Sequence, residues 1–259
     1  LAIAQNRLLE KALFDQLDIP VAPYRAVDSL ESLKQAVTDL GLPIVLKTAT
    51  GGYDGKGQFV LRSEDQIDTA WAELGPAKSL IAESFVKFSR EVSIIAVRGQ
   101  DSDVKTWALA ENHHHNGILS HSIVPAPNST DLQPVAQDYI TRLLNHLNYV
   151  GVLTLELFVT EQGLYANEMA CRVHNSGHWS IEGAICSQFE NHIRAVAGLP
   201  LGATDVVRPT VMINIIGQHP KSEDVLALKG AHLHLYNKSE RAGRKLGHIT
   251  LMPNNSDEL

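Results

Sequence analysis

The sequence predicts a mixed α/β (α+β) protein, and three observations support that class. Apolar positions at helical spacing alternate along the chain with short runs of apolar and β-branched residues. The middle of the chain is especially rich in such runs, which are typical of a sheet. The chain has 259 residues, of which 44% are hydrophobic, so it can bury a core without a disulfide or a metal. This length allows one or two domains.

Local signals place the individual elements. Asp28 and Ser29 can cap a helix, and Ser63 and Gln66 have the spacing of a capping box. Glycine and proline between 198 and 205 indicate a boundary. The expected helices cover 5–17, 29–40, 63–74, 131–147 and 180–197; the expected strands cover 43–47, 58–61, 79–86, 91–98, 104–110, 151–160 and 164–169; a short α/β tail covers 208–252.

Composition excludes several classes of protein. The formal net charge of −7 argues against a general nucleic-acid surface. No apolar run approaches the roughly 20 residues of a membrane span, and no basic segment followed by an apolar core suggests a signal peptide. The two cysteines, Cys171 and Cys186, are too few for a disulfide framework. We therefore expect a cytoplasmic protein with no membrane and no nucleic-acid partner.

Two acidic residues are predicted to face each other on a hairpin. The three-residue turn 161–163 ends in glycine, and a hairpin centred on Gln162 places Glu156 directly opposite Glu168. Their Cβ atoms would be roughly 4.5–5.5 Å apart on one face of the sheet. Two like charges at that distance need a neutralising cation, and Asn167 adds an amide oxygen. The alternative is that each glutamate is simply solvated. We predict an Mg²⁺ or Mn²⁺ site on Glu156 and Glu168.

A glycine-dense stretch lies between two expected strands. Residues 50–57 contain four glycines, which can bring backbone N–H groups close to phosphate. The spacing is not that of a Walker A loop, and no helix follows as in a dinucleotide fold. A plain flexible hairpin is the alternative. Lys47 favours the phosphate interpretation, because a lysine inside an apolar strand needs an anion for its ammonium group.

The order of these parts resembles the ATP-grasp superfamily. Within it the chain is similar to the ligases that carboxylate aminoimidazole ribonucleotide with bicarbonate in purine biosynthesis. Three stretches carry the resemblance: 51–57 (GGYDGKG), 172–179 (RVHNSGHW) and 243–248 (GRKLGH). It implies an ATP-grasp fold with mixed and antiparallel sheets over 1–197, with a lid subdomain at about 20–90 and a metal and substrate subdomain at about 91–197. A small C-terminal α/β domain would cover 198–259.

The resemblance also implies roles for individual residues. Glu83 would lie beside the adenine, and Glu91 would bind the ribose hydroxyls. Which of the three adjacent histidines contacts the nucleotide stays open, although His114 aligns best. The metal would be bound by Glu156 and Glu168. The residues implied for ATP are Arg7, Lys47, Gly51, Gly52, Tyr53, Asp54, Gly55, Lys56, Gly57, Glu83, Ser84, Phe85, Val86, Glu91, His114, Asn167 and Glu168.

The implied reaction transfers the γ-phosphoryl group of ATP to bicarbonate, and the resulting carboxyphosphate carboxylates the substrate amine. Such a transfer needs charge stabilisation above all, so Lys47 and Arg172 are the expected catalytic residues. Arg172 would hold bicarbonate or the transferred phosphoryl group with its forked donors. The expected substrate-binding residues are Asp54, His174, Asn175, His178, Lys238, Arg244 and Lys245.

Some features depart from the family or allow other interpretations. The family normally has an N-terminal domain ahead of this point, so we expect one to precede Leu1; it also commonly forms homodimers. Cys171, Ala242 and Asn6 replace common family residues without removing an expected ligand. His174 and His178 have the spacing of a zinc pair, although a loop composition separates them.

The basic residues near Gly243 have two interpretations, a solvated strand end or a site for a phosphate group.

The remaining alternatives concern function. The chain could be a related ligase that uses another acid, such as a formate-dependent glycinamide ribonucleotide transformylase, or a ligase of the biotin-carboxylase type. It could also be a nucleotide-binding module without turnover.

Overall fold

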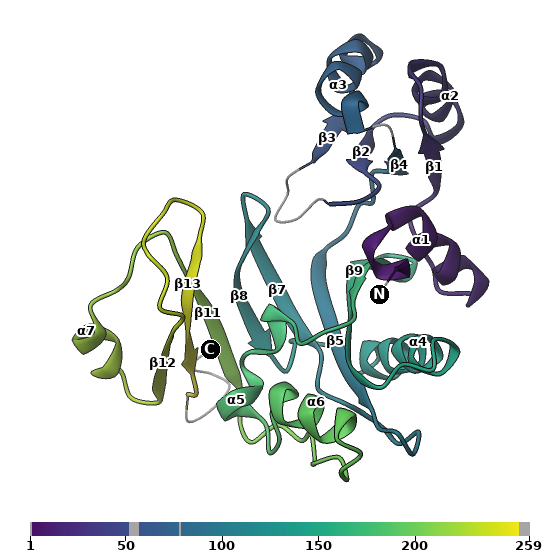
Figure 1. The fold of residues 1–259 in the computed structure, drawn as a ribbon. Helices are drawn as coiled ribbons and strands as arrows, with labels where there is room; N and C mark the ends of the chain where they lie inside the picture. Colours follow the sequence, from purple (N-terminus) through teal and green to yellow (C-terminus); the bar gives the residue numbers. More distant parts are fainter. Residues whose placement is uncertain (1, 52–56, 78, 254–259) are drawn as a thin grey trace. The chain divides into compact units, whose positions relative to one another are not determined.

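A computed structural model describes residues 2–51, 57–77 and 79–253 (Figure 1). The chain forms two compact units, which are described separately. The first comprises Leu1–Ser89 and Phe158–Met169, and the second comprises Arg90–Leu157 and Ala170–Leu259. The expected boundary at 197–198 separates two sequence domains rather than two compact units, and it stays a prediction. In the described residues, no helix is long and apolar enough to cross a membrane.

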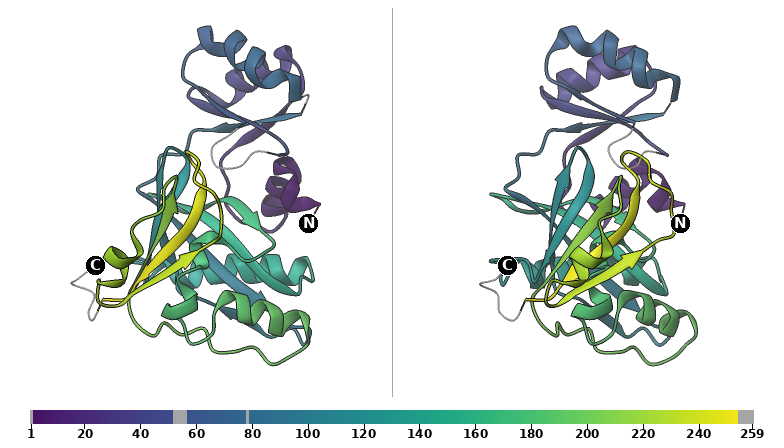
Figure 2. Two further views of the ribbon diagram at one scale, coloured as in Figure 1. Left: turned by 60° about the vertical axis from the view of Figure 1, so that its left-hand side comes forward. Right: turned by 90° about the vertical axis from the view of Figure 1, so that its left-hand side faces the viewer.

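The first unit is built on a four-stranded antiparallel sheet in the order β1-β4-β2-β3. Its helices α2 and α3 lie on the same side of this sheet (Figure 2). The strands are β1 (Tyr24–Val27), β2 (Ile44–Thr48), β3 (Gln58–Leu61) and β4 (Leu80–Ser84); the helices are α1 (Arg7–Gln16), α2 (Leu30–Leu40) and α3 (Ile67–Leu74), with short 3₁₀ turns η1 (Ile3–Gln5), η2 (Glu64–Gln66) and η3 (Gly75–Ala77).

Strand alternation separates an apolar face from a charged face in the first unit. Ile44 and Leu46 are fully buried against α2 and α3. Because successive side chains point to opposite faces, Lys47 is directed away from these helices. Val45 pairs with Glu83 on the neighbouring strand, so Glu83 shares the face of Lys47. The pattern of the sequence thus places two opposite charges on one side of the sheet.

The start of α3 differs from the prediction. Ser63 and Gln66 do not form a capping box, because the side chain of Ser63 makes no capping hydrogen bond. The first turn is a 3₁₀ turn, and Gln66 instead accepts a hydrogen bond from the N–H of Arg62 at 2.8 Å. At α2, Ser29 does form a capping box, with Ser32 as its partner. Residue spacing alone does not distinguish these two arrangements.

The second unit carries most of a nine-stranded sheet in the order β10-β9-β5-β7-β8-β11-β13-β12, with β6 pairing β5. The end of the β9–β10 hairpin belongs to the first unit. The strands are β5 (Arg90–Arg98), β6 (Val104–Thr106), β7 (Ala110–His115), β8 (Ile118–Val124), β9 (Gly151–Thr160), β10 (Gly163–Ala170), β11 (Thr210–Ile216), β12 (Ala231–Leu235) and β13 (Lys245–Leu251); the helices are α4 (Leu132–His146), α5 (Ser180–Gly183), α6 (Gln188–Val196) and α7 (Ser222–Leu226), with a 3₁₀ turn η4 (Asn175–Gly177).

Three elements of the second unit differ from the prediction. The expected strand 104–110 ends at Thr106 as β6, and Ala110 begins β7. The expected helix 180–197 is broken into α5 and α6, because Ala184 is extended and bridges Val206. Ser187 then begins α6 by accepting a hydrogen bond from the N–H of Glu190. The hairpin of β7 and β8 was not predicted at all. Its turn is Asn116-Gly117, with both residues at positive φ, and this dipeptide was the signal that could have revealed it.

One face of strand β5 changes character along its length. Ile95 and Val97 join an apolar cluster that includes Trp179. Glu91 and Ser93 lie on the same face by alternation, but they are polar. The helices therefore cover the apolar end of this face, while the polar end is left for the loop that follows β10. The candidate site of the second unit is built at that polar end.

Candidate functional site

The first unit contains a buried cluster of two lysines around one glutamate, here called the lysine cluster (Lys11, Lys47 and Glu83). The Nζ of Lys47 lies 2.8 Å from Oε2 of Glu83, whose side chain is only 6% exposed. The Nζ of Lys11 lies 3.7 Å from Oε1 of the same carboxylate. Lys11 also donates to the carbonyl oxygens of Ala166 and Asn167 at 3.2 and 3.1 Å, so its ammonium has two hydrogen-bond acceptors and one ion-pair partner.

Charge around the lysine cluster is set by burial and by these pairings. Burial acts to raise the pKa of Glu83, but the two lysines outweigh it and hold the pKa below its usual value. Burial lowers the pKa of Lys11, which Glu83 opposes. The neighbouring Glu10 is buried, accepts from the N–H of Met169 at 2.6 Å, and has its pKa raised by burial to about 8. Two ammonium groups therefore share one ionised carboxylate, Glu83, within the cluster.

The other expected nucleotide residues of the first unit lie near the same strands. Arg7 donates to the carbonyl oxygen of Thr48 at 2.9 Å, at the end of β2. The glycine stretch connects β2 to β3, and its described ends, Gly51 and Gly57, both have positive φ. A side chain at Gly57 would lie 2.9 Å from Oγ1 of Thr48, so this position needs glycine. The expected residues Gly52, Tyr53, Asp54, Gly55 and Lys56 lie outside the described part of the chain.

Regular structure ends one residue after Glu83. Ser84 ends β4, and the N–H groups of Ser84 and Phe85 donate to the carbonyl oxygens of Pro23 and Pro43. Val86 belongs to the connection toward β5. This geometry fits a connecting segment beside the lysine cluster. Its expected role in reading adenine stays a prediction.

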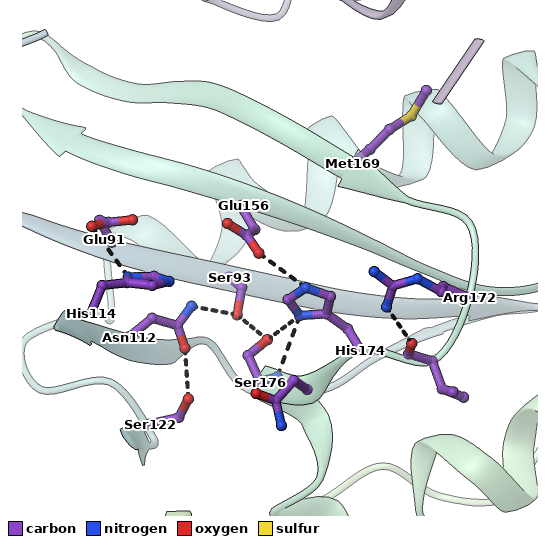
Figure 3. A network of polar contacts seen from close by, with 12 residues as sticks. Glu91, Ser93, Asn112, His114, Ser122, Glu156, Met169, Arg172, His174 and Ser176 are labelled. Carbon is purple, nitrogen blue, oxygen red and sulfur yellow. Dashed lines mark hydrogen bonds and ion pairs between the residues drawn. The ribbon is translucent and has the colours of Figure 1, made fainter. Parts of the chain in front are cut away.

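The second unit presents Glu156 and His174 as an acid and imidazole pair (Figure 3). The Nε2 of His174 lies 3.0 Å from Oε1 of Glu156, and their side chains are 12% and 17% exposed. Burial acts to raise the pKa of Glu156, but the hydrogen bond from His174, with His114 and Lys245 nearby, holds it below its usual value. Glu156 is therefore an ionised carboxylate with one oxygen already bound.

The loop that carries His174 is braced from helix α6. Gln188 is fully buried, and its amide accepts from the N–H of His174 at 2.9 Å and donates to the carbonyl of the same residue at 2.7 Å. Asn175 exchanges two hydrogen bonds with Asn214 of β11, at 2.9 and 2.7 Å. A side chain at Gly177 would lie 2.3 Å from Ile95 and 2.7 Å from Gln188. The loop is thus fixed by specific partners.

The three adjacent histidines of β7 have different surroundings. The Nδ1 of His114 lies 3.3 Å from Oε1 of Glu91. Burial acts to lower the pKa of His114, but Glu91 outweighs it and the net pKa is raised. His113 instead pairs with Glu111 and stacks on the ring of His121. Glu91 on β5 and His114 on β7 were both expected to contact ATP, and their side chains are in contact.

A further cluster of rings lies next to the loop. His178 is 5.2 Å from His248 between ring centroids, and the hydroxyl of Tyr236 lies 2.6 Å from Nδ1 of His248. Burial lowers the pKa of His178 to about 4 and that of His248 to about 3, and it raises the pKa of Tyr236 to about 12. All three groups are uncharged at neutral pH. Their role fits packing and hydrogen bonding.

The expected basic residues lie in the same unit. The ammonium of Lys238 is 5.4 Å from the ring centroid of Tyr236. Arg244 donates to the hydroxyl and the carbonyl of Ser239 at 3.0 and 3.2 Å. Lys245 begins β13 and acts electrostatically on Glu156. Arg172 is exposed and donates to the carbonyl of Val173 at 2.9 Å. Arg172, Arg244 and Lys245 are thus three basic residues of the same unit as His174.

The predicted metal ligands are oxygen donors of the kind Mg²⁺ prefers. Glu156 lies on β9 in the second unit, and Glu168 lies on β10 in the first, so their joint use by a metal stays a prediction. Among the described residues, no group of three or more His, Cys, Asp or Glu could hold a metal ion.

Several buried residues of these sites were not predicted. Glu10 and Lys11 lie on α1 and are 2% and 1% exposed, but an amphipathic pattern marks such charged positions as solvent-facing. Gln188 was also missed, because its partners belong to a loop 14 residues earlier. The Asn116-Gly117 turn was the one available signal for the strand pair that places His114.

Comparison with known proteins agrees with this geometry. The ATP-grasp domain family matches residues 12–189, and the phosphoribosylaminoimidazole carboxylase C-terminal domain family matches residues 210–259. The chain is 48% identical over 260 residues to an N5-carboxyaminoimidazole ribonucleotide synthase of Vibrio vulnificus (strain CMCP6), covering 98% of this chain and 68% of that relative.

Solved structures resemble the chain as a whole. The N5-carboxyaminoimidazole ribonucleotide synthetase of Thermus thermophilus has a TM-score of 0.94 and 47% identity, covering 99% of this chain and 69% of that one. The Aspergillus clavatus N5-carboxyaminoimidazole synthase in complex with ADP and 5-aminoimidazole ribonucleotide has a TM-score of 0.91 and 31% identity, covering 99% and 70%. These similarities confirm the predicted ATP-grasp fold.

Proposed function

Because the chain belongs to the ATP-grasp superfamily and, within it, to the N5-carboxyaminoimidazole ribonucleotide synthase family, we propose that it carboxylates 5-aminoimidazole ribonucleotide. The reaction uses ATP and bicarbonate, proceeds through carboxyphosphate, and serves purine biosynthesis. The observation that carries the proposal is that one chain, 48% identical to such a synthase, matches both the ATP-grasp domain and the carboxylase C-terminal domain.

The lysine cluster is the proposed phosphate site. Lys47 is held by Glu83 at 2.8 Å, and Glu83 is shared with Lys11, so the cluster can accept further negative charge. A phosphate oxygen that approaches Lys47 gains a charge-assisted hydrogen bond. Glu91 and His114 would bind the ribose and the nucleotide. Mg²⁺ or Mn²⁺ bound by Glu156 and Glu168 would neutralise charge on the phosphates.

The loop that begins at Arg172 is the proposed site for bicarbonate. Arg172 offers forked donors that match a planar carboxylate, and it is exposed. His174 and Asn175 supply further polar groups on a loop that is braced by Gln188 and Asn214. Because these groups are held before the substrate binds, less entropy is lost when bicarbonate is aligned with the γ-phosphoryl group.

The basic residues near β13 are the proposed site for the ribonucleotide. Lys238, Arg244 and Lys245 would bind its phosphate by charge-assisted hydrogen bonds. Asp54 is assigned to the same substrate and lies outside the described residues. Replacing Arg244 by alanine should raise the KM for the ribonucleotide about 10- to 100-fold, because such a bond contributes about 1.5–3 kcal/mol. The KM for ATP should stay unchanged; equal effects on both KM values would contradict this assignment.

The remaining proposals concern the cellular compartment and the oligomeric state. We propose the cytoplasm as its compartment, since two cysteines are too few for a disulfide framework. We also propose a homodimer, on the basis of the family. Analytical ultracentrifugation at several concentrations would test the assembly.

Measured release of ADP is the test of the proposed activity. We expect ADP to form with Mg²⁺, ATP, bicarbonate and 5-aminoimidazole ribonucleotide together, and to fall to background when either cosubstrate is left out. Formate in place of bicarbonate should not support the reaction. ADP release that depends on formate, or that does not respond to the ribonucleotide, would reject the proposal in favour of another ATP-grasp ligase or a binding module.

A further inference from the structure

A chain of buried hydroxyl and amide groups lies behind His174 in the second unit (Figure 3). The hydroxyl of Ser122 donates to Oδ1 of Asn112 at 2.8 Å, and Nδ2 of Asn112 donates to the hydroxyl of Ser93 at 2.9 Å. The hydroxyls of Ser93 and Ser176 are 2.7 Å apart, and that of Ser176 lies 2.8 Å from Nδ1 of His174. The chain therefore reaches from strand β8 to the imidazole.

Three strands and one turn supply these groups. Asn112 pairs directly with Ser122 across β7 and β8. Ser93 lies on β5, and Ser176 lies in η4. The exposed fractions are 0% for Ser122 and Ser176, 1% for Ser93 and 6% for Asn112. Buried polar groups are costly unless they are hydrogen-bonded, so a chain of this length in a core is a specific arrangement.

The chemistry of the donors gives the chain a direction. The amide nitrogen of Asn112 can only donate, so Ser93 accepts from it and has its own proton to give to Ser176. The hydroxyl of Ser176 lies 2.8 Å from Nδ1 of His174, where it can donate to a ring nitrogen that accepts. The backbone N–H of Ser176 points to the same Nδ1 at 3.3 Å, and a backbone N–H can only donate. Nδ1 is therefore an acceptor.

The opposite nitrogen of the ring must then carry the proton. An imidazole whose Nδ1 accepts is neutral and has its hydrogen on Nε2. That Nε2 lies 3.0 Å from Oε1 of Glu156, so His174 acts as a donor on the side of the candidate site. Ser122, at the other end of the chain, is fully buried. The chain thus does not lead to solvent at that end, which favours an orienting role over proton delivery.

We propose that Ser176 is a positioning residue that, together with Ser93 and Asn112, holds His174 in the orientation and Nε2–H tautomer in which it donates into the site. The inference rests on the proposed function, because it assumes that His174 faces the bicarbonate. Ser176 itself would not touch the substrate. Its contribution would be to fix the ring before the substrate arrives, as second-layer hydrogen bonds do in other sites.

Replacing Ser176 by alanine is the direct test, with Ser180→Ala as the matched control. Ser180 is also buried in this region, where it donates to the carbonyl of Gly177 and accepts from the N–H of Gln188. These bonds brace the backbone of the loop, and none of them reaches the His174 ring. For Ser176→Ala we expect kcat/KM for bicarbonate to fall about tenfold, with the KM for ATP unchanged, since one neutral hydrogen bond is lost. Ser180→Ala should leave that ratio near its original value.

The second readout is the tautomer itself. Proton–nitrogen NMR of the His174 ring, in the metal-free protein, should show Nε2–H in the unaltered chain and in Ser180→Ala. Ser176→Ala should show a mixture of tautomers. Unchanged tautomer and unchanged kcat/KM in Ser176→Ala would overturn the proposal, and so would equal losses in Ser176→Ala and Ser180→Ala, because they would indicate a general effect on the loop.

Two further outcomes keep the test decisive. If Ser176→Ala does not fold, Ser93→Ala removes the next hydroxyl of the chain, and we expect the same tautomer mixture to a smaller extent. A pure Nε2–H signal in Ser93→Ala would then count against the chain. If the unaltered protein releases no bicarbonate-dependent ADP, the proposed function fails, while the tautomer comparison still decides whether Ser176 orients His174.

Discussion

Glu83 is a buried glutamate and Glu156 is a half-buried one, and the molecule stabilises their charges in different ways. Glu83, in the first unit, is paired with the ammonium groups of Lys47 and Lys11. Glu156, in the second, is paired with the imidazole of His174, which is in turn fixed by buried hydroxyls. Both carboxyl groups have pKa values below the usual one. The first region uses two ammonium groups in direct contact for this purpose, and the second uses a hydrogen-bonded imidazole with His114 and Lys245 nearby.

The different partners of the two glutamates indicate which ligands each site can bind. A carboxylate shared by two lysines leaves cationic hydrogen-bonding capacity for phosphate, because each ammonium is only partly neutralised. A carboxylate held by one hydrogen-bond donor keeps an oxygen and negative charge for a cation or for orienting a substrate. Removing a partner should therefore destabilise the first region more strongly than the second.

The largest effect is expected for Glu83→Gln. The change leaves Lys11 and Lys47 buried without their shared counter-charge, and breaking a buried ion pair costs about 3–5 kcal/mol. Urea unfolding should show this loss in the free energy of unfolding. The matched control is Glu73→Gln, because Glu73 is exposed on α3, and its effect should be within about 0.5 kcal/mol. A Glu83→Gln variant as stable as the control would mean that the lysine cluster does not depend on its charge.

Glu156→Gln should affect activity more than stability. The amide keeps a similar shape and can still accept from His174, but it removes the carboxylate charge at the proposed site. We expect kcat to fall at least about 100-fold, as for the loss of one stabilising group in a transition state, with unfolding changed by less than in Glu83→Gln. A large loss of stability with normal kcat would reverse the proposed contrast between the two glutamates.

A third contrast concerns the pH dependence of stability, where the two units should differ in sign. Glu10 has its pKa raised from 4.5 to about 8, so its contribution is present below pH 4.5 and is lost as the pH rises through about 8. His178 and His248 have pKa values lowered from 6.5 to about 4 and 3. Their contribution is present above pH 6.5 and is lost as the pH falls through these values.

Urea unfolding between pH 4 and pH 9 would separate these contributions. Glu10→Gln should reduce the loss of stability between pH 5 and pH 8, since a glutamine side chain does not titrate. The acidic loss should persist in this variant, because His178 and His248 are unchanged. If Glu10→Gln left the alkaline side as steep as before, the buried carboxyl of Glu10 would not be its cause.

Particular residues show how far the sequence predicts this structure. Lys47 lies in an apolar strand, so the need for an anion was predictable, but strand pairing determines that the anion in this structure is Glu83. Glu156 and His174 were both expected in the site, yet their contact depends on a loop braced by Gln188. Local patterns reveal which residues are unusual for their element. They do not reveal partners that tertiary packing brings together.

The missed residues have the same explanation. Glu10 and Lys11 look like the solvent face of an amphipathic helix, but strand β10 covers them and supplies their backbone partners. The break between α5 and α6 depends on a bridge between Ala184 and Val206, 22 residues apart. In each case the competing influence is a contact distant in sequence, and helical or strand spacing contains no information about it.

The central claim, that bicarbonate is activated by ATP before it carboxylates the ribonucleotide, can be tested by following oxygen. Bicarbonate labelled with ¹⁸O is incubated with Mg²⁺, ATP, 5-aminoimidazole ribonucleotide and the protein, and the inorganic phosphate is analysed by ³¹P NMR. The account predicts one ¹⁸O atom in each phosphate released, because carboxyphosphate transfers an oxygen of bicarbonate to phosphorus. Phosphate without ¹⁸O, in a reaction that still consumes ATP, would contradict it.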